Sequence, residues 1–346
     1  MSQPKLTIAE IDTLLQQQLP AGYTLRPSTL ADVSGAVAMH NASAIDTLGA
    51  PQFTEEEFRA DWQEPGFTLA TDSRVVTTAE GQIVGTTDAV ANPPYVRNLI
   101  WARVHPAFRG RGIGTVLTRW AESRLLERLD EAPAGARVTV DCFNLDTHTA
   151  AKTLLTELGY HHERSYYRMK IELSAPPPLP AWPAGMTIRT MIPKQEEAAV
   201  YRAKEEAFQD HWGYVATPFE EGFALWQHHL QHNPDHDPTL FFLALDGDEI
   251  AGYALCDPKI TDDPAMGWIA NLGVRRPWRR RGLALALLHH AFGEFYRRGV
   301  KKVGLGVDAG SLTGATRLYE KAGMKPFRQY NTYEKELRPG QDLVRR

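Results

Sequence analysis

The chain has 346 residues, 43% of them hydrophobic and 23% charged, and its formal net charge at pH 7 is −4. This composition indicates a globular protein long enough for two domains, and the slightly acidic balance argues against a general nucleic-acid binder. No apolar run approaches the ~20 residues of a membrane span, and with two cysteines no disulfide framework is expected. Because the N-terminus also lacks a basic segment followed by an apolar one, we expect a cytoplasmic location.

The first half of the chain alternates strand and helix patterns. Strands are predicted at residues 23–26, 67–71, 74–78, 83–90, 99–104, 138–141 and 165–173. Helices are predicted at residues 8–18, from about residue 30, from residue 113, and at 150–158, where Gly159 ends the helix.

The second half repeats this order. Strands are predicted at residues 187–190, 240–244, 250–255, 268–274, 302–307 and 330–337. Helices are predicted at residues 196–208, 283–296 and 313–322, and Gly323 ends the last one. The repeated order predicts a tandem duplication of one α/β domain.

A proline-rich segment at residues 174–185 separates the two halves, with five prolines in twelve residues. Such a composition is typical of an extended, fairly stiff spacer. We therefore expect a first domain over residues 1–173, a linker over 174–185, and a second domain over 186–340.

A basic, glycine-rich turn occurs in both halves, 170 residues apart, at residues 109–114 (RGRGIG) and 279–284 (RRRGLA). Each turn lies between a predicted strand and the start of a predicted helix. The first N–H groups of a helix lack partners, the helix dipole favours an anion there, and glycine allows close approach to the backbone. The sequence therefore predicts one phosphate-binding turn in each half.

The two turns resemble the (Gln/Arg)-x-x-Gly-x-(Gly/Ala) signature of the GCN5-related N-acetyltransferase superfamily, and residues 318–324 (LYEKAGM) are similar to a second element of it. The tandem layout looks like the mycothiol synthase type of double acetyltransferase. The resemblance implies two mixed sheets flanked by helices, acetyl-CoA as co-substrate, and a strand before each turn that separates from its neighbour to pair with the pantetheine arm. The coenzyme contacts that it implies are Val104, Arg109, Gly110, Arg111, Gly112, Ile113, Gly114 and Thr115 in the first half, and Leu272, Gly273, Val274, Arg279, Arg280, Arg281, Gly282, Leu283, Ala284 and Ser311 in the second.

By resemblance, Tyr319 is the general acid that protonates the coenzyme A sulfur, although a helix tyrosine can also be a plain core residue. The matching position in the first half is Leu155, which cannot donate a proton. We therefore expect the second domain to be catalytic and the first to be degenerate.

The general base is less clear, because neither strand before a turn carries the glutamate that many family members use. Asp210 and His211, with Glu206 nearby, are the candidate bases, and His211 can equally be a packed helix end.

The expected reaction is direct transfer of an acetyl group to a primary amine of a small molecule, an amino sugar or a peptide. A non-catalytic acyl-CoA-binding sensor is the alternative. No metal is expected, since the histidines at 228–236 lack partner ligands and Pro234 interrupts their helix. The phosphates of coenzyme A account for the arginines at 275–281, so no nucleic-acid or membrane partner is expected, and the protein is predicted to be a monomer or a homodimer.

Overall fold

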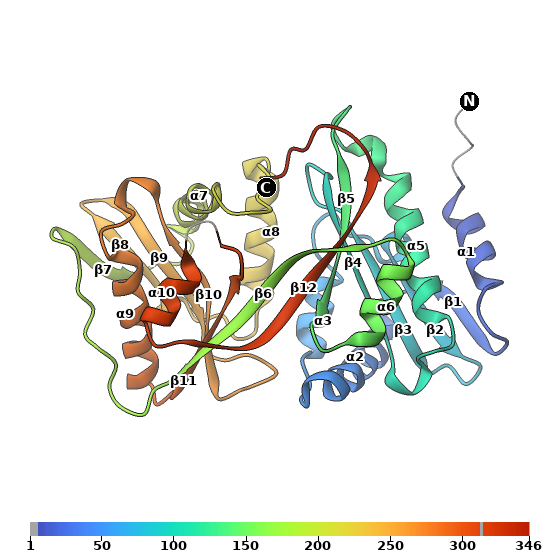
Figure 1. The fold of residues 1–346 in the computed structure, drawn as a ribbon, viewed down its shortest axis with the longest axis horizontal. Helices are drawn as coiled ribbons and strands as arrows, with labels where there is room; N and C mark the ends of the chain where they lie inside the picture. Colours follow the sequence, from blue (N-terminus) through green and yellow to red (C-terminus); the bar gives the residue numbers. More distant parts are fainter. Residues whose placement is uncertain (1–5, 312–313, 346) are drawn as a thin grey trace. The chain divides into compact units, whose positions relative to one another are not determined.

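The computed structural model describes residues 6–311 and 314–345, so the predicted helix at 313–322 begins at a residue outside the described part. The chain divides into two compact units (Figure 1). Unit 1 comprises Met1–Glu163 and Asn331–Val344, and unit 2 comprises Arg164–Tyr330 and the last two residues.

Unit 1 is built on a mixed sheet in which the neighbouring strands β4 and β5 run parallel. In order across the sheet, the strands are β1 (Tyr23–Pro27), β2 (Ser73–Thr78), β3 (Ile83–Val90), β4 (Arg97–Val104), β5 (Val138–Leu145) and the second part of β12 (Lys325–Arg338). The helices are α1 (Ile8–Gln16), α2 (Val33–Leu48), α3 (Glu55–Asp61), α4 (Leu69–Asp72), α5 (Ile113–Glu127) and α6 (Thr149–Glu157).

Unit 2 has the same architecture, and here β10 and β11 are the parallel pair. In order across the sheet, the strands are β6 (His161–Glu172), β11 (Lys302–Asp308), β10 (Met266–Val274), β9 (Glu249–Asp257), β8 (Phe241–Asp246) and β7 (Met186–Thr190). The helices are α7 (Glu197–Phe208), α8 (Phe219–His232), α9 (Leu283–Arg297) and α10 (Ala315–Lys321). The predicted fold class, a tandem pair of mixed sheets flanked by helices, is confirmed.

Hydrophobic clusters lie on both faces of the unit 2 sheet because its strands alternate their side chains. Along β9, Ala254 and Cys256 join the cluster that contains α9 and Tyr319 of α10, whereas Tyr253 and Leu255 join the cluster that contains α7. Helices α9 and α7 therefore cover opposite faces.

One predicted strand is absent from unit 1. Residues 67–71 were expected to be extended, but α4 begins at Leu69 instead. The backbone N–H of Thr68 donates to the side chain of Asp72 (2.9 Å), and such a local bond competes with pairing into a sheet. The short helix α3 was not predicted, although Thr54 and Glu57 form the capping box that starts it.

The last strand of each repeat crosses the division of the chain. Most of β6 belongs to unit 2, where residues Tyr166–Glu172 pair antiparallel with β11, and the second part of β12 belongs to unit 1. The predicted boundaries placed residues 164–173 in the first domain and 331–340 in the second. The structure differs because the two halves exchange these final strands.

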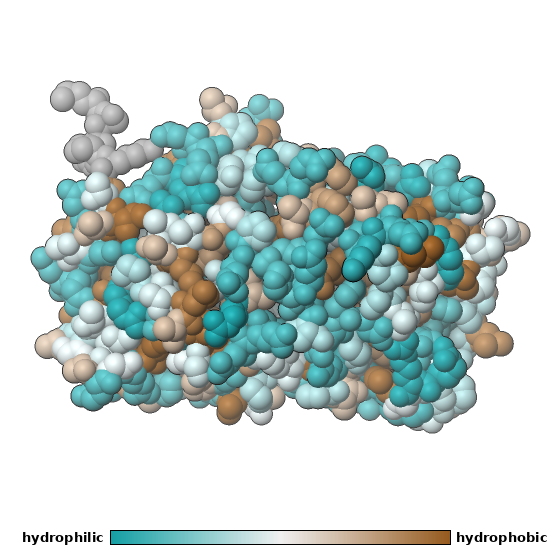
Figure 2. Space-filling model, turned by 180° about the vertical axis from the view of Figure 1, so that it is seen from behind, coloured by the Kyte–Doolittle hydropathy of each residue, from teal (hydrophilic) through white to brown (hydrophobic). Residues whose placement is uncertain are grey.

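Among the described helices, none is both long and apolar enough to cross a membrane. The face of the molecule shown in Figure 2 carries mostly hydrophilic side chains, with hydrophobic ones in small separate groups.

A buried carboxyl in β3 makes the stability of unit 1 depend on pH. Asp88 accepts hydrogen bonds from Ser73 Oγ (2.5 Å) and Trp62 Nε1 (3.2 Å), and burial raises its pKa to about 7. An unfolded aspartate ionises near pH ~3.9, so between pH ~4 and ~7 only the unfolded chain loses this proton. The free energy of unfolding should therefore fall as the pH rises, by at most about 1.4 kcal/mol per pH unit.

The substitution Asp88→Asn removes this titration. Relative to the unmodified protein, the free energy of unfolding of the variant should be about 2–3 kcal/mol higher at pH ~7.5 than at pH ~4.5, as measured by urea denaturation at both pH values. A difference that does not change with pH would contradict the prediction.

Candidate active site

The two basic turns adopt the same backbone conformation. In unit 1, Gly110 and Gly112 have φ values of +75° and +79°, and in unit 2 the equivalent Arg280 and Gly282 have +61° and +86°. A left-handed arginine costs energy that glycine does not, and such strain is concentrated at functional sites. Gly112 and Gly282 are the N-caps of α5 and α9, so each turn presents the first N–H groups of a long helix.

In both units the parallel strands before these turns separate from each other. The pairing of β4 with β5 ends at Ile100 and Cys142, and the pairing of β10 with β11 ends at Ile269 and Leu305. All four strands continue beyond those points. Each sheet therefore opens beside its basic turn, as the resemblance implied.

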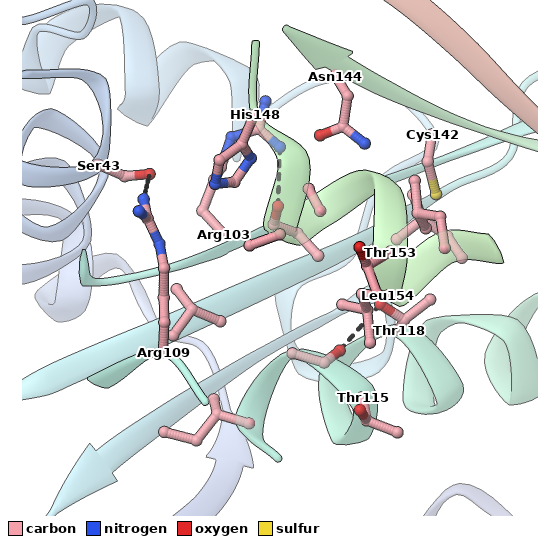
Figure 3. Close-up of a pocket in the computed structure, with 18 of the residues that line it drawn as sticks. Ser43, Arg103, Arg109, Thr115, Thr118, Cys142, Asn144, His148, Thr153 and Leu154 are labelled. Atoms are coloured by element: carbon pink, nitrogen blue, oxygen red, sulfur yellow. Dashed lines mark hydrogen bonds between the residues drawn. The ribbon is translucent and has the colours of Figure 1, made fainter. Parts of the chain in front are cut away.

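A pocket of about 420 Å³ occupies this opening in unit 1 (Figure 3). Seven of the residues predicted to contact coenzyme in this half line it: Val104, Arg109, Gly110, Gly112, Ile113, Gly114 and Thr115. The eighth, Arg111, donates to Tyr23 Oη (2.6 Å) and lies against the ring of Phe108. The volume of the pocket is in the range of small-molecule sites.

Sequence reasoning missed much of this pocket, because most of its other side chains come from β4, β5 and α6, and Ser43 and Thr118 come from α2 and α5. Arg103, Asn144 and His148 lie at one end of it (Figure 3). Burial lowers the pKa of His148 to about 4, with Arg109 and Arg103 adding to the effect, so the ring is neutral at pH 7. Cys142 also lines the pocket, and burial raises the pKa of its thiol to about 12.

At the basic turn of unit 2, some arginines form ion pairs within the protein and others are exposed to solvent. Asp210 accepts from Arg276 (2.6 Å) and Arg279 (2.7 Å), and these guanidinium groups hold its pKa well below the usual range. Arg280 and Arg281 are exposed and form no ion pair with any residue in 6–311 or 314–345. Two cations are thus available at the helix N-terminus, the position that favours a phosphate.

The other predicted residues of unit 2 lie around the same opening. Leu272, Gly273 and Val274 form the end of β10, and Leu283 and Ala284 begin α9. Ser311 Oγ accepts from the N–H of Ala315 (3.4 Å) at the start of α10. His211 packs on Phe208 with ring centroids 4.2 Å apart, and burial lowers its pKa.

Asp210 does not suit the predicted role of base. A carboxylate held by two arginines gives up that pairing if it takes a proton, so it is a poor proton acceptor at neutral pH. The arrangement instead makes Asp210 the residue that orients Arg276 and Arg279.

Tyr319 and Leu155 occupy equivalent places in the two units. The N–H of Met324 donates to the carbonyl of Tyr319 (2.9 Å), and the N–H of Tyr160 donates to that of Leu155 (2.9 Å), at helix ends of the same form. Tyr319 is 8% exposed, and burial raises its pKa to about 12, so its hydroxyl keeps its proton.

The strand β10 carries a bulge at the point where it leaves β11. Ile269 pairs with Cys256 and Asn271 pairs with Leu255, so Ala270 is an extra residue on β10. Ala270 is exposed, whereas its neighbour Ile269 is buried. In the described part of unit 1, the pairing of β3 with β4 runs without such a shift. A bulge leaves backbone groups out of the ladder, so the described part of unit 2 has, at Ala270, backbone outside the β9–β10 ladder, which the β3–β4 ladder of unit 1 does not have.

One cluster of side chains has the composition of a metal site. Ligand atoms of His161, Glu163 and Glu334 lie within 4.8 Å of one another in unit 1. Arg137 already pairs with Glu334 (2.8 Å), so a cation there would have to displace a guanidinium group.

Each unit has an anion-binding turn beside two parallel strands that separate. This arrangement is typical of a class of α/β proteins that bind a phosphate-bearing ligand with its reactive end between the separated strands, and here it is present twice. Comparison with known proteins makes the class specific. A family model described as the Acetyltransferase (GNAT) family matches residues 39–160 and 198–324. The chain belongs to this family and is an N-acetyltransferase enzyme that uses a coenzyme A-linked acyl donor.

Individual proteins are similar to this chain over most of its length. A solved GCN5-related N-acetyltransferase from Sphaerobacter thermophilus is 39% identical, covers 94% of this chain and 98% of its own, and has a TM-score of 0.75. A mycothiol acetyltransferase from Salinispora arenicola is 28% identical over 90% of this chain and 94% of its own. The tandem GNAT protein of the clavulanic acid biosynthesis pathway is 17% identical, covers 92% of this chain and 100% of its own, has a TM-score of 0.67, and shares the fold.

Proposed function

We propose that unit 2 transfers an acetyl group from acetyl-CoA directly to a primary amine, with Tyr319 as general acid. The observation that carries this proposal is the difference between the two units at one place in the fold. Unit 2 has a protonated hydroxyl on Tyr319 where unit 1 has the side chain of Leu155. The departing thiolate needs a proton, and a hydroxyl can supply it where an alkyl group cannot.

The coenzyme would lie with its pyrophosphate on the N–H groups at Gly282–Ala284, beside the free cations of Arg280 and Arg281. Its pantetheine arm would pair with the end of β10, which has left β11. The thioester would then lie near the bulge at Ala270, where backbone groups outside the ladder can stabilise a developing oxyanion.

The acceptor is proposed to be a small-molecule amine, which the similarity to proteins named mycothiol acetyltransferase supports. Unit 1 is proposed to hold a second coenzyme without turning it over. The intact turn and pocket of unit 1 support binding, and Leu155 explains the loss of chemistry.

Matched glycine substitutions test both parts of the proposal. Gly112→Val and Gly282→Val place a β-branched residue at φ values of +79° and +86°, which strains each turn by about 1–3 kcal/mol. Calorimetric titration with acetyl-CoA should show two sites per chain, and each substitution should remove one. Turnover, followed as thiol release with glucosamine, cysteamine and a dipeptide as acceptors, should be lost with Gly282→Val.

Three results would overturn the proposal. Absence of acetyl-CoA binding would remove its basis, and loss of turnover with Gly112→Val alone would move the chemistry to unit 1. Binding without turnover of any primary amine would favour the alternative, an acyl-CoA sensor.

A further inference from the structure

The pocket of unit 1 has polar side chains at one end that the proposed binding of a second acetyl-CoA does not use. Arg103, Asn144 and His148 line this end (Figure 3). The acyl end of acetyl-CoA is a carbonyl group and a methyl group, and a methyl group forms no hydrogen bonds. The polar end of the pocket therefore indicates a ligand with more hydrogen-bonding groups than an acetyl thioester has.

Asn144 is a buried amide without a hydrogen bond in the protein. The residue is 6% exposed, and no residue in 6–311 or 314–345 hydrogen-bonds to its side chain. A buried polar group without a partner costs free energy, so such groups are rare in folded proteins. Because Asn144 lines the pocket, a bound ligand can supply the missing partner.

His148 presents a second buried polar atom of this kind. Its Nε2 has no hydrogen-bond partner within the described part of the chain. His148 is the N-cap of the nine-residue helix α6, but its side chain forms no capping bond, and Ala150 and Ala151 of the first turn also line the pocket. The first N–H groups of a helix lack helical partners and favour an anion, and a neutral imidazole can donate from Nε2.

Arg103 supplies a positive charge at the same end. Its Nη1 donates to the carbonyl of Ala102 (2.8 Å), and its guanidinium lies 4.5 Å from the ring centroid of Trp101, so the side chain is held against the pocket wall. Among the described residues that line the pocket, Glu157 is the one carboxylate. It is exposed and is the last residue of α6, at the other end of the helix from His148. The polar end is therefore suited to an anion.

Unit 2 differs from unit 1 at two of these places. Strands β5 and β11 continue past the point where their parallel partners leave them, and two residues beyond that point lie Asn144 and Val307. Val307 belongs to the hydrophobic cluster that contains Tyr319. Arg103 and Gly273 each precede the valine that ends β4 or β10. The unit proposed to transfer acetyl groups thus has valine and glycine where unit 1 has an amide and a guanidinium.

We propose that unit 1 binds a coenzyme A thioester whose acyl group ends in a carboxylate, such as a succinyl group, and that Arg103, Asn144 and His148 bind this carboxylate. The inference rests on the coenzyme binding proposed above for unit 1. A carboxylate accepts several hydrogen bonds and pairs with a guanidinium, so it satisfies all three side chains together. Acetyl-CoA shares the coenzyme part and binds the same site more weakly.

Other chemical classes of acyl group fit this end of the pocket less well. An ammonium group would lie beside the guanidinium of Arg103, and like charges repel. An alkyl chain would leave the amide of Asn144 and Nε2 of His148 buried without partners. A carboxylate avoids both costs.

The test is calorimetric titration of the full-length Gly282→Val variant, in which only the turn of unit 1 is intact. Succinyl-CoA should bind about 10- to 100-fold more tightly than butyryl-CoA, which has a carbon chain of the same length without the carboxylate. Adding Arg103→Met or Asn144→Val should remove most of this preference and leave the affinity for butyryl-CoA within about threefold. Arg119→Met is the control, because Arg119 lies on α5 outside the pocket and donates to Gln18.

Asn144→Val in the otherwise unmodified protein gives a second readout, which a merely structural residue would not give. The change introduces the side chain that unit 2 has at Val307, and it removes an unpaired buried amide. The free energy of unfolding of the unliganded variant, from urea denaturation, should therefore be no lower than that of the unmodified protein. A variant that loses stability together with binding would give Asn144 a structural role and contradict the inference.

The outcomes separate this inference from the proposed function. If neither the unmodified protein nor Gly282→Val binds a coenzyme A thioester in unit 1, the coenzyme binding proposed for this unit is wrong. If acetyl-CoA, butyryl-CoA and succinyl-CoA bind unit 1 equally well, unit 1 holds the coenzyme but the carboxylate site is wrong. If free succinate added with coenzyme A binds as tightly as succinyl-CoA, the carboxylate belongs to a separate acid, and its assignment to the acyl group is overturned.

Discussion

Replacing Tyr319 by phenylalanine is expected to lower kcat by about 10²–10³-fold, the range of a lost general acid, and to leave acetyl-CoA affinity almost unchanged. The ring still fills its buried place in the core, so the free energy of unfolding should change by less than about 1.5 kcal/mol. Steady-state kinetics with the active acceptor and calorimetry with acetyl-CoA give the two measurements.

The pH dependence of the unmodified enzyme gives a further readout on Tyr319. Because burial raises the pKa of this hydroxyl to about 12, it remains protonated throughout the neutral range. It should therefore contribute no loss of kcat at alkaline pH below about 11. Tyr296→Phe is the control, since Tyr296 is another tyrosine of unit 2, half-buried where Tyr319 is buried, and it contacts Lys301. Equal kcat values for Tyr319→Phe and the unmodified protein would contradict the proposed role.

The basic turns could be predicted because their signals are local in sequence. Glycine in the left-handed region and arginine beside a helix N-terminus lie within six residues of one another in each turn. The equivalence of Leu155 and Tyr319 also follows from short segments, each ended by a glycine with positive φ.

The side chains beside the opening of unit 2 could not be predicted in the same way. Tyr253 and Asn271, which hydrogen-bond to each other, come from β9 and β10, and no spacing in the sequence relates them. Asp210 is the opposite case: the sequence makes it a candidate base because no partner for its carboxylate is visible in the sequence. Its two arginine partners lie 66 and 69 residues away and meet it only in the folded chain.

The exchange of the final strands cannot be predicted from the sequence pattern, for a related physical reason. A strand at the end of a repeat has the same alternation of side chains whichever sheet it joins. What distinguishes the partners is long-range pairing, such as the seven-residue register of β6 with β11. The position of residues 331–344 in unit 1 therefore emerges only from the structure.

The segment exchanged into unit 1 brings a buried charge with it, and the second large effect is expected there. Glu334 is 1% exposed, and Arg137 donates to it (2.8 Å) while also pairing with the more exposed Glu336. Arg137→Met removes the guanidinium from a buried carboxylate, which should lower the free energy of unfolding of unit 1 by about 3–5 kcal/mol. Glu336→Gln breaks only the exposed pair and should cost less than about 1 kcal/mol.

A double substitution separates the cost of burying charge from the value of the ion pair. In Arg137→Met with Glu334→Leu no charge is left buried, so urea denaturation should show most of the lost stability restored. If the double variant is no more stable than Arg137→Met alone, the arginine acts through its packing rather than its charge. If Arg137→Met lowers the free energy of unfolding no more than Glu336→Gln does, the pair of Arg137 with Glu334 does not hold the exchanged strand in unit 1, and the prediction is wrong.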